Sequence, residues 1–207
     1  MRKDTLRRHE EEDTADRILN NLGLTWESLK GKTILDIGAA DAALAKAGLR
    51  RGITIISIDK DVDYLDKYWK RHLPKKMSYI LADARNLPFP DECFDIAIAH
   101  ASVPLIHTKS RDDIRDVLSE TYRVLKPKGQ FRFGDCAEGT IHPEILEGGT
   151  VPNMFRWADK DRNIARDQAR TLAMLQEVFP QINRRRPKRK LNATQQYYIL
   201  RKPPKAK

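Results

Sequence analysis

Acidic residues stand directly after two apolar segments, at positions that suit a nucleoside ligand. Asp59 follows the β-branched segment 53–58, and Asp83 with Ala84 follows the segment 77–81. A carboxylate at the end of a strand can accept hydrogen bonds from both hydroxyls of a ribose. The Asp83 carboxylate suits the exocyclic amine of adenine, and the amide of Ala84 suits a ring nitrogen. The plainer alternatives are a helix cap for Asp59 and, for the Asp-Ala pair, no function at all.

A turn of small residues follows a third apolar segment. It reads Gly38-Ala39-Ala40-Asp41-Ala42 and follows the apolar segment 33–37, which carries Asp36. A small-residue turn between a strand and a helix lets backbone amides approach a ligand closely. With a single glycine it is a poor dinucleotide fingerprint, and a purely structural turn would look similar. Three acidic or small-residue turns at successive strand ends nevertheless favour a ligand site.

Alternating strands and helices would bring these turns together. Hydrophobic periodicity and stop signals predict helices over 9–22, 41–51, 62–72, 110–125 and 161–178, and strands over 33–37, 53–58, 77–81, 94–99, 130–133, 182–190 and 195–202. Such alternation implies β-α-β units, and hence a mainly parallel α/β sheet covered on both faces. In these sheets ligands bind at the carboxyl ends of the strands, which is where the three turns fall.

The length of 207 residues predicts one domain over 1–207, with an N-terminal helical part in 1–30 and a basic segment in 181–207. The net charge of +10 comes from ten basic residues after position 180, where no acidic residue occurs. This basic segment is either an electrostatic footprint for a polyanion such as RNA or a solubilising tail. The candidate nucleic-acid contacts are Arg184, Arg185, Arg186, Lys188, Arg189 and Lys190.

Other classes of protein are disfavoured by composition. No apolar run approaches the ~20 residues that a membrane-spanning helix needs, and the charged first 13 residues do not resemble a secretory signal. Cys93 and Cys136 lie far apart and outside any cysteine–histidine cluster. We therefore expect a cytoplasmic protein with reduced thiols and no metal site.

The ordered set of motifs resembles the S-adenosylmethionine (SAM)-dependent methyltransferases of class I, the Rossmann-like type. It consists of Leu-Asp-Ile-Gly at 35–38, the acid at 59, Ala-Asp-Ala-x-x-Leu-Pro-Phe-x-Asp-x-x-Phe-Asp at 82–95 and Glu-x-x-Arg-Val-Leu-Lys-Pro-x-Gly at 120–129. The match covers about 32–135. It implies a doubly wound, seven-stranded sheet of order 3-2-1-4-5-7-6, with the last strand antiparallel, helices on both faces and SAM as cofactor.

The resemblance also implies roles for individual residues. The turn at Gly38 would contact the amino-acid end of SAM, Asp59 its ribose, and Asp83 with Ala84 its adenine. Alanines replace the two later glycines of the family turn, at 40 and 42, so we expect a cofactor to fit if neither position needs a positive φ. The full set of predicted cofactor contacts is Asp36, Gly38, Ala39, Ala40, Asp59, Lys60, Asp83, Ala84 and His100.

No catalytic residue follows from the resemblance, because SAM carries its own activated methyl group. His100 is a weak candidate for a general base, and its alternative role is lining the pocket. His107, Asp135 and Trp157 are candidates to face the substrate, the last two within the irregular stretch 135–161. The segment 100–104 lacks the Pro-Pro-Tyr-type motif of enzymes that methylate exocyclic base amines, and neither cysteine sits in a cytosine C5 motif.

Two functions remain open at this point. The first is a methyltransferase acting on a small molecule, RNA or protein. The second is a non-catalytic protein of the same fold that binds RNA or a protein partner through its basic segment, a hypothesis favoured by the missing glycines. A nicotinamide-dependent oxidoreductase is disfavoured, because Gly-x-Gly-x-x-Gly is absent.

Overall fold

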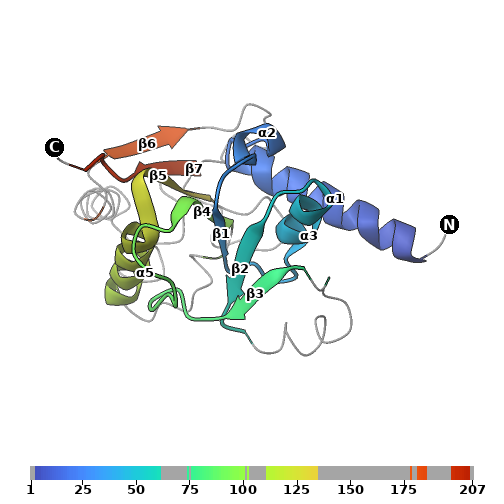
Figure 1. The fold of residues 1–207 in the computed structure, drawn as a ribbon, viewed down its shortest axis with the longest axis horizontal. Coiled ribbons are helices and arrows are strands. Elements are labelled where there is room, and N and C mark those ends of the chain that lie inside the picture. Colours follow the sequence, from blue (N-terminus) through green and yellow to red (C-terminus); the bar gives the residue numbers. More distant parts are fainter. Residues whose placement is uncertain are drawn as a thin grey trace, which may run out of the picture.

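The computed structural model describes residues 3–61, 74, 76–100, 102, 111–134, 178, 181–185 and 197–205. Its centre is a seven-stranded sheet of order β3-β2-β1-β4-β5-β7-β6 (Figure 1). The strands are β1 (Ile34–Ile37), β2 (Ile55–Asp59), β3 (Ser78–Leu81), β4 (Phe94–His100), β5 (Leu125–Gly134), β6 (Gln181–Arg185) and β7 (Tyr197–Arg201). The helices are α1 (Lys3–Asn21), α2 (Trp26–Leu29), α3 (Ala43–Arg50) and α5 (Arg111–Val124).

The topology confirms the predicted fold class. Strands β3, β2, β1, β4 and β5 run parallel, and β7 pairs antiparallel with both β5 and β6. Since β1 is central and buried along its whole length, its sequence Ile-Leu-Asp-Ile is nearly all apolar, as parallel strands covered on both faces usually are. The order of strands reverses between β1 and β4, which makes this the switch point where ligands bind in such sheets.

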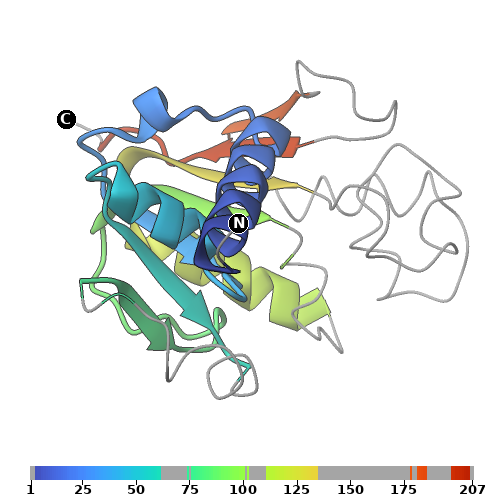
Figure 2. The ribbon, with the colours of Figure 1, turned by 90° about the vertical axis from the view of Figure 1, so that its right-hand side faces the viewer.

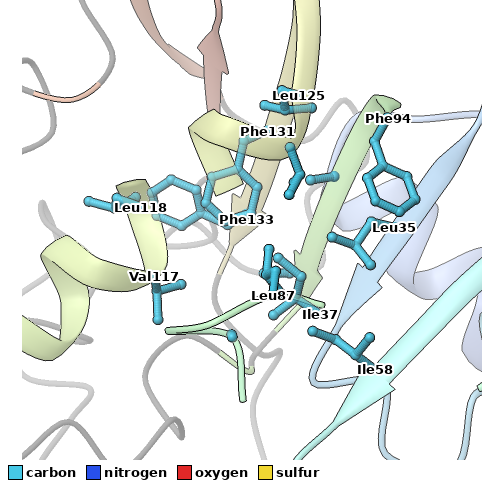
Figure 3. Close-up of a cluster of buried hydrophobic side chains, with 14 of the residues drawn as sticks. Leu35, Ile37, Ile58, Leu87, Phe94, Val117, Leu118, Leu125, Phe131 and Phe133 are labelled. Carbon is cyan, nitrogen blue, oxygen red and sulfur yellow. The ribbon is translucent and has the colours of Figure 1, made fainter. Parts of the chain in front are cut away.

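Helices cover both faces of the sheet. Helices α1 and α3 lie together on one face, and α5 lies on the other (Figure 2). Alternate residues of β1 point to opposite faces, so Ile34 joins the core beneath α1 and α3 while Leu35 and Ile37 join the core beneath α5. In the second core Leu87 lies beside Ile37, between Val117 of α5 and the sheet (Figure 3).

Two element boundaries differ by several residues from the predicted ones. Helix α1 begins at Lys3 and not at 9. The fifth strand begins at Leu125, directly after α5, and not at 130. The short helix α2 was not predicted; the Thr25–Ser28 capping box stabilises its N-terminus. The predicted helices 62–72 and 161–178 lie outside the described residues, apart from position 178. Within the described part of the chain, no helix has the length and apolarity to cross a membrane.

Candidate functional site

The turn between β1 and α3 has a left-handed backbone at three positions. Gly38 has φ of 69°, Ala40 of 44° and Ala42 of 47°. We expected a cofactor to fit if neither alanine needed a positive φ, and that condition is not met, because both adopt one. A left-handed conformation costs an L-residue about 1–2 kcal/mol. The turn therefore keeps a glycine-type backbone with alanines in it, and the strain is held by its surroundings.

Gly38 itself admits no side chain. A Cβ atom placed there would lie 2.2 Å from Cβ of Ser102, which is buried against the turn. The Ser102 hydroxyl donates a 2.6 Å hydrogen bond to the carbonyl of Ile37 at the end of β1. Sequence reasoning expected the segment after β4 to line the site but did not select Ser102. The only available signal was a small hydroxyl residue two positions beyond the strand end.

Strand β2 holds the turn in place. The amides of Gly38 and Ala39 both donate to the carbonyl of Ile58, at 2.9 and 3.0 Å. One Asp59 oxygen accepts from the amide of Ala40 at 2.9 Å, and the other accepts from the amide of Asp61 at 3.0 Å. The amides of the turn thus point to β2. Each carboxylate oxygen of Asp59 has a second lone pair that can accept a hydrogen bond from a ligand hydroxyl.

Asp36 is a buried carboxyl beneath this turn, with a relative exposure of 5%. It pairs in register with Ser57, which pairs with Tyr79, so the three side chains share one face of the sheet. Burial, followed by the carboxylates of Asp59 and Asp41, raises the pKa of Asp36 to about 7. Within the described residues Asp36 has neither a hydrogen bond nor an ion pair. A buried carboxylate of this kind favours a ligand that brings a positive charge.

The turn after β3 contains Asp83, whose carboxylate is already paired. Arg85 binds both oxygens, with its closest contact at 2.6 Å, and the amide of Arg85 also donates to it at 2.9 Å. The Arg85 hydrogen bond lowers the pKa of Asp83. Ala84 is buried in the core beneath α5. Any amine bound by Asp83 would therefore share the carboxylate with a guanidinium.

His100 ends β4 and contacts α1. Its Nε2 atom lies 2.9 Å from the side-chain amide nitrogen of Asn21, the last residue of that helix. Burial, with a smaller contribution from Arg17, lowers the pKa of His100 to about 4. The ring is therefore neutral near pH 7 and a weak base, which favours the pocket-lining role over proton transfer.

Known proteins are similar in sequence to part of this chain. A family model described as a methyltransferase domain matches residues 35–133. A ubiquinone/menaquinone biosynthesis C-methyltransferase of Rickettsia typhi is 37% identical over 124 residues, covering 52% of this chain and 47% of that protein. An O-methyltransferase of Aspergillus nomiae is 30% identical over 149 residues, covering 66% of this chain and 64% of that protein.

Residues 35–133 of the chain match the class I SAM-dependent methyltransferase family. The chain spans about half the length of the curated relatives it matches. A phosphoethanolamine N-methyltransferase of Haemonchus contortus, solved in complex with SAM, has a TM-score of 0.60 at 16% identity, covering 93% of this chain and 53% of that one. The shared fold, with SAM as the cofactor of the family, agrees with the prediction from the motifs.

The structure brings the three predicted turns to one edge of the sheet, since β1, β2 and β3 are parallel neighbours. Lys60, next to Asp59, is exposed. Within the described residues, no group of three or more His, Cys, Asp or Glu could hold a metal ion. The predicted substrate-facing residues His107, Asp135 and Trp157 lie outside the described residues.

The basic segment is only partly described. The backbone of Arg184 and Arg185 lies in β6, at the edge of the sheet, whereas Arg186, Lys188, Arg189 and Lys190 lie outside the described residues. Beyond β7, Lys202 and Lys205 approach Glu92 at 3.5 and 2.7 Å. Those two charges are thus engaged by the fold, and RNA binding by the rest stays a prediction.

Proposed function

We propose that this chain binds SAM across the turns after β1, β2 and β3 and transfers its methyl group to a small-molecule acceptor. The observation that carries the proposal is Asp36, a buried carboxyl without a positive partner among the described residues. It lies beneath a left-handed turn at the switch point of the sheet. SAM offers both an ammonium and a sulfonium group, so it suits a site that lacks a cation.

The residues present fit the cofactor. Asp36 would attract its positive charge, and the free lone pairs of Asp59 would accept from the ribose hydroxyls. Gly38 keeps its own side of the turn free of a side chain, because Ser102 occupies the space that a Cβ atom would take. Bound SAM supplies an activated methyl group, so the protein has to bind it, orient the acceptor and exclude water.

The left-handed alanines also bear on the non-catalytic alternative. That hypothesis was favoured by the missing glycines, on the argument that a degenerate turn no longer accommodates SAM. Ala40 and Ala42 adopt the positive φ angles that glycine favours, so the turn has a glycine-type backbone although it contains alanines. On this ground we propose the enzyme in preference to the binding protein.

The relatives, which are named as O- and C-methyltransferases, support a proposal for the class of acceptor molecule. We propose a small molecule and not a nucleic acid base, since the motif for exocyclic amines is absent from 100–104. His100 would line the pocket as a neutral ring held by Asn21.

Calorimetric titration with SAM at pH 8 tests the proposal. We expect saturable binding that Asp59→Asn weakens by about tenfold, because a charge-assisted hydrogen bond contributes about 1.5–3 kcal/mol. Asparagine keeps one side-chain oxygen for the amide of Ala40, which separates ligand binding from collapse of the turn. The control is Glu27→Ala, which removes an exposed carboxylate of α2. Absence of SAM binding by the unmodified chain would refute the proposed function.

A further inference from the structure

Two charged residues of α5, Glu120 and Arg123, form hydrogen bonds with the loop that follows β3. The Glu120 carboxylate accepts from the amide of Leu87 at 2.8 Å, and it binds Arg123 through both oxygens, at 2.7 and 2.8 Å. Arg123 donates to the carbonyl of Leu87 at 2.9 Å, to that of Phe89 at 2.8 Å and to the carboxylate of Asp91 at 2.9 Å. This Glu120–Arg123 clamp thus satisfies both backbone groups of Leu87.

The clamped loop continues directly from the predicted adenine contacts. The amide of Asn86 donates to the carbonyl of Asp83 at 3.0 Å, which folds residues 83–86 into one turn. Ala84, inside this turn, and Leu87, directly after it, are both buried in the core beneath α5. Leu87 lies between α5 and the sheet (Figure 3). The turn is therefore anchored by Leu87, and Leu87 is anchored by the clamp.

The electrostatics favour a permanent contact. The Arg123 hydrogen bond is the largest cause of a lowered pKa at Glu120, and Glu120 in turn raises the pKa of Arg123. Both groups stay charged throughout the physiological range. A bidentate arginine–carboxylate pair has a defined geometry, which lysine does not reproduce.

We propose that Glu120 and Arg123 are positioning residues for cofactor binding. They act through Leu87, fixing the backbone of Asp83 and Ala84 so that the adenine edge finds its hydrogen-bonding partners in place. This inference rests on the proposed function, and it assigns a role to the Glu-x-x-Arg part of the motif, which touches none of the three turns itself. Loosening the clamp should weaken SAM binding even when the chain remains folded, because a preformed site needs no ordering on binding.

The test compares Arg123→Lys with the loss of an ion pair elsewhere in the fold. Lys126 and Asp95 form that control: Lys126 Nζ lies 2.9 Å from the Asp95 carboxylate, which also accepts from the amide of Thr33. This pair links the start of β4 to the start of β5, away from the strand ends that carry the three turns. Lys126→Met therefore removes a similar interaction without touching the clamped loop.

We expect Arg123→Lys to raise the Kd for SAM by about tenfold, or about 1.4 kcal/mol, and Lys126→Met to leave it little changed. Both are titrated at a temperature where urea unfolding curves show them folded. In the free protein, the backbone amide NMR signals of Asp83 and Ala84 should shift in Arg123→Lys and not in Lys126→Met. Glu120→Gln, which keeps an acceptor for Leu87, should weaken binding less.

Two outcomes have different meanings. If the unmodified chain does not bind SAM, the proposed function fails and the clamp has no cofactor to position. If the unmodified chain binds SAM and Arg123→Lys binds it equally well, or if both variants weaken binding in proportion to their loss of stability, the positioning role is refuted while the function stands.

Discussion

Replacing Asp36 with asparagine should stabilise the free protein and lower its affinity for SAM. Asparagine has nearly the same shape but carries no charge. In the native chain the carboxyl is buried with a pKa of about 7, whereas an aspartate in an unfolded chain has a pKa of about 3.9. Between these values the unfolded state binds fewer protons than the native state, so the native state loses stability as the pH rises from about 4 to 7.

The shift of about three pKa units sets an upper limit. At 1.36 kcal/mol per unit, ionising Asp36 in the free protein destabilises it by at most about 4 kcal/mol above pH 7. Asparagine removes this penalty and retains only the smaller cost of a buried amide. The difference in unfolding free energy between variant and native chain should therefore be small near pH 4 and favour the variant increasingly up to pH 8.

Urea unfolding at several pH values between 4 and 8, with and without SAM, measures both effects. Subtracting the unfolding free energies of the two proteins cancels the contributions of titrating groups that do not interact with Asp36. The native chain should bind SAM more tightly as the pH rises through about 7, because the ionised carboxylate attracts the cationic cofactor, and the variant should lose that dependence. A stability difference that does not change with pH would refute the reasoning.

The remaining predictions concern the turn and His100. Gly38→Ala should lower the free energy of unfolding by about 3 kcal/mol, through backbone strain and collision with Ser102. Gly52→Ala has the same φ of 69° but open space around it, so it should lose only about 1 kcal/mol. Equal losses in urea unfolding would contradict the collision. Ala40→Gly should stabilise by about 0.5 kcal/mol by relieving a left-handed residue. Ala42→Gly should be near neutral, because it also loses a buried methyl worth about 0.8 kcal/mol. NMR titration should show the His100 ring neutral down to about pH 4. Because the unfolded chain takes up this proton at a higher pH, His100 should reduce stability as the pH falls below about 6.5. A titration midpoint near 6.5 would show that the ring is not buried.

The fold was predictable because its signals are local and repeated. Apolar strands alternating with helical segments, each closed by a glycine, a proline or an acid, leave few topologies for a parallel sheet. The order of the seven strands came from the family resemblance, since periodicity alone does not place β7 between β5 and β6. The start of β5 at Leu125 was missed because Pro127 and Gly129 predict a break between helix and strand. The strand instead continues through them, with a shift in register between Phe94 and Ile96 of β4.

For the site, the sequence predicts which turns lie together but not the contacts of their side chains. Asp59 and Asp83 were selected as ligand acceptors, but their partners Ala40 and Arg85 are set by backbone geometry and side-chain rotamers that no spacing encodes. Asn21 lies 79 positions from His100, so their contact depends on how α1 packs.

The alanines of the turn show how a motif can lose its residues and keep its geometry. Glycine is favoured at positive φ because it lacks a Cβ, but the backbone path is set by what holds it. Here that path is fixed by two amides on the Ile58 carbonyl and one on Asp59. The strain of two left-handed alanines is on the order of 2–4 kcal/mol, which a few such hydrogen bonds can offset. Asp59 thus stabilises the turn, in addition to the ligand contact that we propose for it.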